Sequence, residues 1–123
     1  MRILLVEDHG MVRKTICAQL QALGHEVSQA EDGSEALAKL ERADSYYDLL
    51  LTDIRMPGKL DGWSVAEHAR RVHPKLPVLY ATAFSNTPYR PVPRSIVLKK
   101  PFTTQMLSES LSRLCDQAGG LSH

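Results

Sequence analysis

Residues 49–58 read Leu-Leu-Leu-Thr-Asp-Ile-Arg-Met-Pro-Gly, an apolar run that ends on the carboxylate of Asp53 and leads into a turn. A short apolar run that stops at a turn signal is typical of a β-strand buried on both faces of a parallel sheet. Asp53 then lies at the carboxyl end of a central strand, the edge at which open α/β sheets bind ligands. Taken alone, this position leaves two interpretations open, a cap for the loop and a functional site.

Strands and amphipathic helices alternate on either side of this strand. Five strands are expected at residues 2–6, 25–29, 47–52, 77–81 and 95–98. Four helices are expected to begin near residues 11, 32, 61 and 103, with apolar stripes at Val12, Ile16, Leu20 and Leu23, at Ala36, Leu37 and Leu40, at Val65, Ala69 and Val72, and at Met106, Leu107, Leu111 and Leu114. Right-handed strand–helix units of this kind build a mostly parallel sheet with helices on both faces, so the pattern predicts an α/β fold.

One connection departs from this alternation. Residues 84–94, between the fourth and fifth strands, contain Pro88, Pro91 and Pro93. Proline removes a backbone donor and clashes inside a helix, and it disfavours helical geometry at the residue before it. We therefore expect the helix between these strands to be short, irregular or missing.

The composition is that of an ordinary globular domain, with a net charge of only +1 from 15 basic and 14 acidic side chains. This balance argues against a nucleic-acid or membrane-surface partner. No apolar run approaches the roughly 20 residues that span a bilayer, and no signal peptide opens the chain, so we expect a cytoplasmic protein with Cys17 and Cys115 as reduced thiols. Met1 lies just ahead of the first strand, which favours a natural start, and residues 118–123 are expected to fray beyond a single domain of residues 1–117.

Polar side chains follow the other strands at the same edge as Asp53. They are Glu7 and Asp8 after the first strand, Thr82 after the fourth and Lys100 after the fifth. Two carboxylates about 4 Å apart repel by about 4 kcal/mol at an effective dielectric constant near 20, so three of them require a cation or a raised pKa. Oxygen ligands that meet phosphate oxygens suit Mg²⁺. With that ion, one carboxylate can attack phosphorus and form an aspartyl phosphate, while the hydroxyl and the ammonium group stabilise the phosphoryl oxygens.

These residues lie in short motifs that resemble those of response regulator receiver domains, the phosphoacceptors of two-component signalling. The motifs are Leu-Leu-Val-Glu-Asp at 4–8, Leu-Thr-Asp-Ile-Arg-Met-Pro at 51–57, Asp-Gly at 61–62, Ala-Thr-Ala at 81–83 and Lys-Pro-Phe at 100–102. Each motif is weak by itself, but five in family order span nearly the whole chain. The resemblance implies a flavodoxin-like, doubly wound sheet of five parallel strands in the order 2-1-3-4-5.

The resemblance also implies a role for each acidic residue. Asp53 would be the phosphoacceptor and a Mg²⁺ ligand. Asp8 would bind the ion directly, Glu7 directly or through water, and the main-chain carbonyl of Arg55 would be a further ligand. His9, next to the acidic pair, could be read as a metal ligand or phosphodonor, but we expect it to line the loop or cap the following helix.

Thr82 and Lys100 complete the site that the resemblance implies. Thr82 would hydrogen-bond the phosphoryl group and change rotamer with it, and Lys100 would pair with the phosphoryl oxygens. Lys100 rather than Lys99 holds the family position, because it directly precedes the proline of its motif. In the family, this Lys-Pro peptide bond is cis.

Two features depart from the common receiver pattern. Receivers usually carry an aromatic residue three positions before the catalytic lysine, where this chain has Val97. The proline-rich segment also takes the place of a regular helix. With Tyr-Ala-Thr-Ala-Phe at 80–84 and an extra residue within 56–62, these departures resemble the FATGUY type of receiver, which occurs alone or in hybrid kinases and is typically partnered by histidine kinases of the HWE or a related class.

The leading function is that of a phosphoacceptor that takes a phosphoryl group from a histidine of a partner kinase or phosphotransfer protein, and not that of an enzyme acting on other molecules. Its readout would be a surface near the proline-rich segment, the fifth strand and the last helix, recognised by a downstream protein. A docking module without phosphorylation and a receiver cut from a hybrid histidine kinase stay open as alternatives. A phosphohydrolase is disfavoured because Arg55 stands where its second acid usually lies, and a nucleotide binder because no glycine-rich loop follows the first strand.

Overall fold

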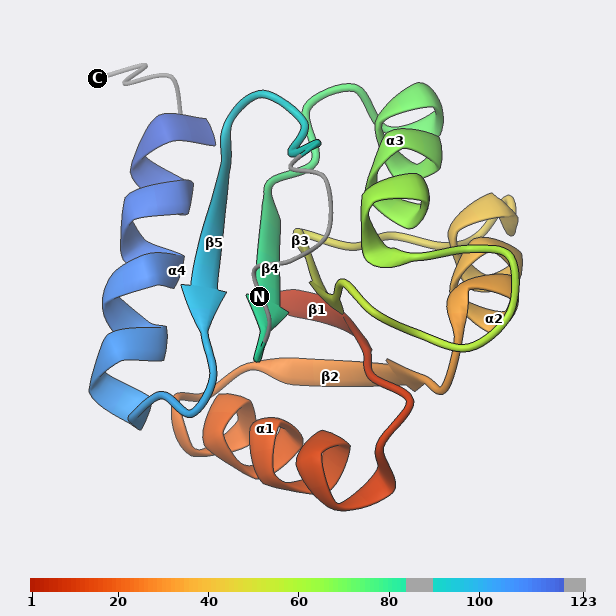
Figure 1. Cartoon of the computed structure of the whole chain (residues 1–123). Coiled ribbons are helices and arrows are strands. Elements are labelled where there is room, and N and C mark those ends of the chain that lie inside the picture. Colours follow the sequence, from red (N-terminus) through yellow and green to blue (C-terminus); the bar gives the residue numbers. More distant parts are fainter. Residues whose placement is uncertain (84–89, 119–123) are drawn as a thin grey trace.

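The computed structural model describes residues 1–83 and 90–118, in which strands and helices alternate (Figure 1). The elements in chain order are β1 (Arg2–Val6), α1 (Gly10–Ala22), β2 (Glu26–Ala30), α2 (Gly33–Glu41), β3 (Leu49–Asp53), α3 (Gly62–Val72), β4 (Val78–Thr82), β5 (Ser95–Lys99) and α4 (Thr104–Ala118). Within these residues, none of the helices combines the length and apolar character that a membrane span requires. Cys17 is buried, Cys115 is partly buried, and both are free thiols.

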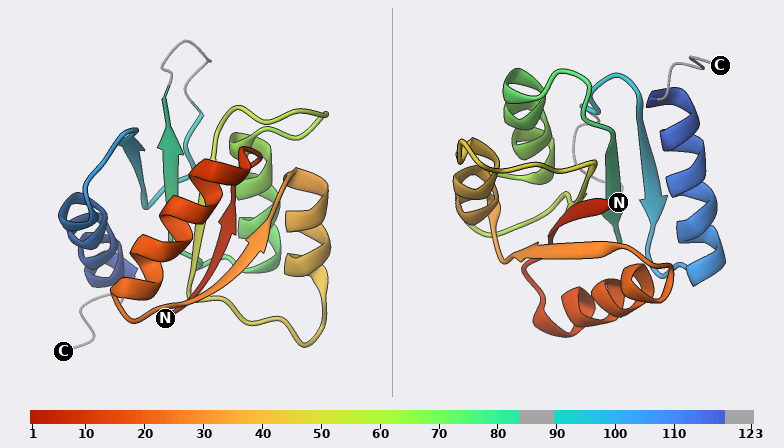
Figure 2. Two further views of the ribbon diagram at one scale, coloured as in Figure 1. Left: turned by 90° about the horizontal axis from the view of Figure 1, so that it is seen from below. Right: turned by 180° about the vertical axis from the view of Figure 1, so that it is seen from behind.

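The five strands form one parallel sheet in the order β2-β1-β3-β4-β5, which confirms the predicted flavodoxin-like α/β topology. The two views of Figure 2 show helices on both faces of the sheet. Side chains of α2 and α3 pack with one face, and side chains of α1 and α4 pack with the other. The strand order reverses between β1 and β3, so the carboxyl ends of these two strands flank the switch point where doubly wound sheets bind ligands.

The apolar run before Asp53 forms the centre of the sheet. Every residue of β3 is buried, and its side chains alternate between the two layers of the core. Leu50 packs with the α2–α3 layer, whereas Leu49 and Leu51 pack with the α1–α4 layer. Each fully buried leucine contributes about 2 kcal/mol of hydrophobic stabilisation, so this strand fixes the depth and direction of Asp53 at its end.

A glycine sets the path of the chain after β3. The amide of Gly62 donates a 2.7 Å hydrogen bond to the carbonyl of Ile54. A Cβ atom at residue 62 would lie only 2.1 Å from the main-chain oxygen of Asp53, a distance that no side chain tolerates. Asp61 caps α3 by accepting a 2.9 Å hydrogen bond from the amide of Ser64. The Asp-Gly motif therefore holds the start of α3 directly against the end of β3.

Two residues that were predicted to lie on the buried faces of helices are exposed in the structure. Val72 and Met106 were expected on inner faces, but their side chains are 47% and 41% exposed. Val72 is the last residue of α3, beyond the part of the helix that covers the sheet. Met106 directly precedes the buried Leu107, and a rotation of about 100° per residue turns it away from the core.

The predicted strand bounds need small corrections. The third strand starts at Leu49 rather than at residue 47, although Asp48 already contacts β1: its amide donates to the carbonyl of Arg2, and its carboxylate accepts a 2.7 Å hydrogen bond from the amide of Arg2. The proline-rich connection contains no helix at residues 90–94. The remainder of that predicted irregular segment, residues 84–89, and residues 119–123 of the predicted frayed tail lie outside the described residues.

Candidate functional site

Three carboxylates meet at the carboxyl ends of β1 and β3. Glu7 and Asp8 directly follow β1, and Asp53 ends β3. One oxygen from each of these side chains lies within 4.8 Å of the others. Glu7 and Asp53 are only 2% and 8% exposed, whereas Asp8 faces solvent. The predicted gathering of these acids at one edge of the sheet is therefore present in the structure.

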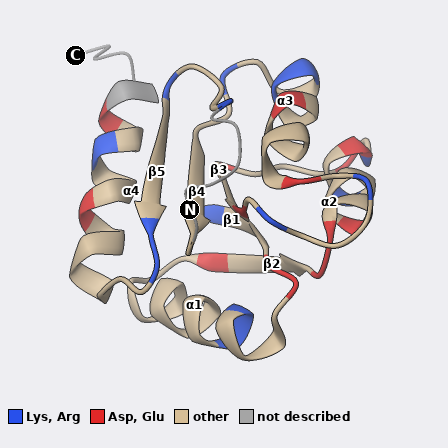
Figure 3. Cartoon of the chain, viewed as in Figure 1, with Lys and Arg blue, Asp and Glu red and all other residues tan. Residues whose placement is uncertain are grey.

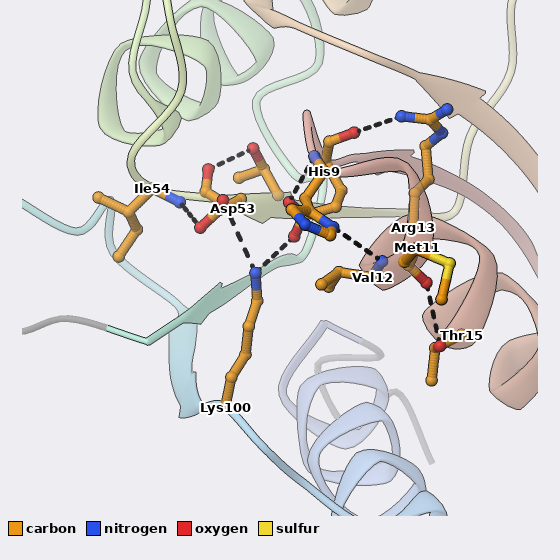
Figure 4. Close-up of polar contacts among 10 residues, drawn as sticks. His9, Met11, Val12, Arg13, Thr15, Asp53, Ile54 and Lys100 are labelled. Atoms are coloured by element: carbon orange, nitrogen blue, oxygen red, sulfur yellow. Dashed lines mark hydrogen bonds and ion pairs between the residues drawn. The ribbon is translucent and has the colours of Figure 1, made fainter.

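Lys100 reaches this acidic cluster from the end of β5, a basic segment of the ribbon in Figure 3. Its Nζ lies 2.5 Å from Oε1 of Glu7 and 3.6 Å from Oδ2 of Asp53 (Figure 4). The side chain is only 16% exposed, so solvent screens these two ion pairs weakly. The Lys100–Pro101 peptide bond is cis, as the resemblance to receiver domains implied.

Backbone groups hold two of the carboxylates in place. The amide of His9 donates to Oε2 of Glu7 at 3.1 Å, and the amide of Ile54 donates to Oδ1 of Asp53 at 2.8 Å. His9 also caps α1, because its Nδ1 accepts a 3.4 Å hydrogen bond from the amide of Val12. This contact confirms the expected capping role of His9.

The electrostatics of the cluster favour an added positive charge. The pKa of Asp53 is raised to about 6, mainly by burial and also by the negative charges of Glu7 and Asp8. The ammonium group of Lys100 and the hydrogen bond from Ile54 oppose this rise without cancelling it. A carboxyl group with this pKa gains from a cation bound nearby. Three clustered carboxylates supply the hard oxygen donors that such an ion prefers, so the cluster is suited to metal binding.

Thr82 ends β4, the strand next to that of Asp53, and Arg55 follows Asp53 in the loop after β3. Thr82 is buried at the end of β4, and its carbonyl accepts a 2.8 Å hydrogen bond from the amide of Lys100. The register pairs Asp53 with Ala81, so Thr82 lies one residue beyond Asp53 on the neighbouring strand. Arg55 is exposed in the loop two residues after Asp53. The structure thus brings Glu7, Asp53 and Lys100 into direct contact and places the other predicted site residues around them.

Tyr80 makes a long-range contact that the spacing of the sequence does not predict. Its hydroxyl oxygen accepts a 3.1 Å hydrogen bond from the amide of Val92, which belongs to the connection between β4 and β5. Tyr80 is two residues before Thr82 on the same strand. Only its place in the Tyr-Ala-Thr-Ala-Phe motif hints at a role, because a large aromatic residue next to the site stands out among smaller strand residues.

Comparison with known proteins identifies the family. Residues 3–112 match the model of the response regulator receiver domain. The response regulator receiver protein CpdR of Brucella abortus is 32% identical over 117 residues, which cover 92% of this chain and 95% of CpdR. Other curated relatives are far longer, and the chain spans only 9% of the length of two of them.

Solved structures agree with this match. A response regulator receiver protein from Sinorhizobium medicae superposes with a TM-score of 0.89 and 31% identity, covering 96% of both chains. The receiver domain of the sensor histidine kinase PA1611 from Pseudomonas aeruginosa, solved with a magnesium ion coordinated in its active-site cleft, superposes with a TM-score of 0.80 and 30% identity. It covers 96% of this chain and 97% of that domain. The chain therefore belongs to the family of response regulator receiver domains, the phosphoacceptor domains of two-component signalling.

Proposed function

We propose that Asp53 is the residue of this receiver that becomes phosphorylated. The observation that carries the proposal is the buried contact of Asp53 with Lys100 inside a cluster of three carboxylates. In the transfer, a carboxylate oxygen of Asp53 forms a bond to phosphorus while the bond from phosphorus to the imidazole nitrogen of a partner phosphohistidine breaks. The imidazole keeps the released electron pair and takes up a proton.

Glu7, Asp8 and Asp53, with the main-chain carbonyl of Arg55, would hold a Mg²⁺ ion. When bound, the ion would neutralise charge on the oxygens of the phosphoryl group. The raised pKa of Asp53, caused first by its burial, supports this assignment, since a bound cation would stabilise the ionised carboxylate that burial disfavours. The magnesium ion of the related PA1611 domain supports it independently.

Lys100 and Thr82 would orient the phosphoryl group. Without a phosphoryl group, Lys100 already pairs with Glu7 and Asp53, so its ammonium group is positioned before the reaction. A positioned charge stabilises the transition state without the cost of reorganising solvent. Thr82 would donate its hydroxyl to a phosphoryl oxygen, and the short backbone link from Lys100 to its carbonyl would couple the two residues.

The partner that supplies the phosphoryl group would be a histidine kinase or a phosphotransfer protein. An apolar groove of about 250 Å³ lies beside Lys100, between α1 and the start of the β5–α4 loop, and is lined by the exposed Met11 and the partly buried Phe102 among other residues. Such a groove fits an apolar helix that presents a histidine to Asp53. Because the motif resembles that of FATGUY receivers, we propose a histidine kinase of the HWE class as this partner. Such a kinase consumes ATP, so the receiver would act in the cytoplasm.

The same assignment makes the chain a signalling domain rather than an enzyme that acts on other molecules. Residues 1–117 would act as one receiver, and a downstream protein would recognise its phosphorylated surface. Both a stand-alone regulator and a module of a longer kinase fit this role. The match to CpdR, which covers 95% of that protein, supports a stand-alone regulator, and the match to the receiver domain of the sensor kinase PA1611 supports a module of a longer kinase.

Acetyl phosphate with Mg²⁺ tests the assignment directly. Intact-mass spectrometry should detect one added phosphate on the parent chain and none on Asp53→Asn or after removal of divalent ions with EDTA. Asp44→Asn is the matched control, because this carboxylate is highly exposed and lies outside the cluster. A phosphate that persists on Asp53→Asn would refute the assignment, and its absence from the parent chain would favour a docking module that needs no phosphorylation.

A further inference from the structure

Tyr80 is the largest side chain of the core that is fully buried and also carries a polar atom in contact with a loop. It is 0% exposed, and its ring centroid lies 4.6 Å from that of Trp63 at the start of α3. Its hydroxyl oxygen accepts a hydrogen bond from the amide of Val92, and the side chain of Val92 is buried as well. Burial raises the pKa of Tyr80 to about 12, so the hydroxyl stays neutral and able to hydrogen-bond at any physiological pH.

The position of Tyr80 in the sheet links it to the site. Tyr80 and Thr82 are two residues apart on β4, so their side chains point to the same face of the sheet. The register pairs Tyr80 with Val97, the position at which receivers usually carry their aromatic residue. A small residue at 97 leaves room beside it for a large one at 80. The aromatic side chain therefore lies one strand closer to Asp53.

The segment that contains Val92 is also attached to α3. One guanidinium nitrogen of Arg90 lies 3.8 Å from Asp61, 3.5 Å from Glu67 and 3.4 Å from the hydroxyl of Ser64. These pairs are half exposed and individually weak, but they place one cation over the first two turns of the helix. Val92, two residues further on, is held by Tyr80.

The following turn is constrained as well. Arg94 has a φ of 57°, a left-handed conformation that is costly for a side chain of this size. Its carbonyl accepts a 3.0 Å hydrogen bond from Arg70, and its guanidinium donates a 3.1 Å hydrogen bond to the carbonyl of Pro74. Side-chain contacts with α3 and with the loop after it thus fix the conformation of residues 90–94.

We propose that the hydrogen bond from Val92 to the hydroxyl of Tyr80 reports the state of the Asp53 site to the surface formed by residues 90–94 and the first two turns of α3. This role rests on the proposed phosphorylation of Asp53. A movement of Thr82 towards a phosphoryl group shifts the end of β4, and Tyr80 shifts with it. A buried hydrogen bond is either made or broken, so a small shift of β4 becomes a discrete change at Val92.

Tyr80→Phe removes only the oxygen that Val92 contacts and keeps the ring that fills the core. The test compares amide NMR spectra of the parent and variant chains, each with Mg²⁺ alone and with Mg²⁺ and beryllium fluoride as a stable mimic of the phosphoryl group. In the parent, we expect the amides of Ile54, beside Asp53, and of Val92 to shift. In Tyr80→Phe, Ile54 should shift as before, whereas the shift of Val92 should be lost.

The single tryptophan of the chain gives a second readout, because Trp63 contacts the ring of Tyr80. Its emission should change with beryllium fluoride in the parent and in Tyr80→Phe alike, because the ring that moves with β4 is kept. A Val92 shift that is lost in the variant then reports the hydrogen bond and not a β4 that fails to move. Tyr47→Phe is the matched control, since it also removes a partly buried hydroxyl, which contacts Ser28 away from the site. This control should keep every response of the parent.

Arg90→Gln separates the outer part of the link from the inner part. In the parent, the amide of Ser64, whose hydroxyl contacts Arg90, should shift as well. The variant keeps the Tyr80 hydroxyl but loses the cation over α3, so the Val92 shift should persist while the Ser64 shift is lost. A Val92 shift of the same size in Tyr80→Phe as in the parent would overturn the inference. An unchanged Ile54 amide in the parent would instead show that Asp53 does not respond, which removes the proposed function and this inference together.

Discussion

The cluster around Asp53 makes the stability of the ion-free protein depend on pH in a direction that is unusual for a carboxylate. The pKa of Asp53 is raised from 3.8 to about 6 by burial and by two neighbouring carboxylates. The folded state therefore holds its proton more tightly than the unfolded chain. The stabilisation is fully present below about pH 3.8 and is lost as the pH rises through about 6. A difference of about 2 pKa units corresponds to about 3 kcal/mol of unfolding free energy.

Asp53→Asn should remove this loss, because asparagine stays neutral. Urea unfolding in EDTA, followed by circular dichroism, measures the unfolding free energy of both chains from about pH 4 to about pH 7.5. Relative to the parent, Asp53→Asn should gain about 3 kcal/mol over that range. The exposed Asp44→Asn serves as the control, and it should follow the parent within about 0.5 kcal/mol.

Mg²⁺ provides the second half of the test. An ion held by the carboxylates favours the ionised form of Asp53, so millimolar Mg²⁺ should stabilise the parent at neutral pH and flatten its pH dependence. It should stabilise Asp53→Asn much less. If the parent and Asp53→Asn show parallel pH profiles in EDTA, Asp53 is ionised in the folded protein as easily as in the unfolded chain, and the reasoning from burial is refuted.

Three further substitutions test the frame of the site. Gly62→Ala should cost about 3 kcal/mol or more in urea unfolding and abolish phosphorylation by acetyl phosphate, because its Cβ would overlap the main-chain oxygen of Asp53; a stable, phosphorylated variant would contradict the packing. Lys100→Ala should leave Mg²⁺ binding by calorimetry nearly intact while the amide shifts caused by beryllium fluoride weaken, and loss of metal binding would contradict its assigned role. Asp32→Ala should cost about 1 kcal/mol through loss of the α2 cap, against little change for Asp44→Ala, and equal effects would show that the cap is not formed.

The sequence was sufficient to predict the sheet and the acidic cluster, because both depend on local patterns. Buried parallel strands appear as short apolar runs, and their carboxyl ends meet at one edge whatever the details of the loops. Glu7, Asp53 and Lys100 each follow such a run, so their contact could be predicted from strand ends alone. The closer approach of Lys100 to Glu7 than to Asp53 could not, since it depends on how far each side chain reaches into the cluster.

The errors occur where the inner face of a helix ends. Val72 and Met106 fit an apolar stripe by spacing, but each lies at the border of the buried face. Val72 ends α3, and Met106 lies beside the buried Leu107 in the first turn of α4, on the side turned away from the core. Periodicity identifies which residues share a face, whereas the length of sheet beneath them decides which of these are buried. That length is a property of the assembled fold and is not encoded in any single window of sequence.

Long-range polar contacts are the part of the site region that spacing could not reveal, and Tyr80 shows why. Valine at position 97 appeared in the sequence only as the loss of an aromatic residue. The register of β4 with β5 shows that the aromatic residue lies instead on the neighbouring strand, because the large ring of Tyr80 is directly beside the small side chain of Val97. Residue volumes on neighbouring strands must sum to fill the same layer of the core, so a change at one position is compensated at its partner. In a receiver that lacks the usual aromatic residue on the fifth strand, an aromatic residue should therefore be sought at the paired position of the fourth strand. In this chain that residue is Tyr80, whose hydroxyl group accepts the hydrogen bond from Val92.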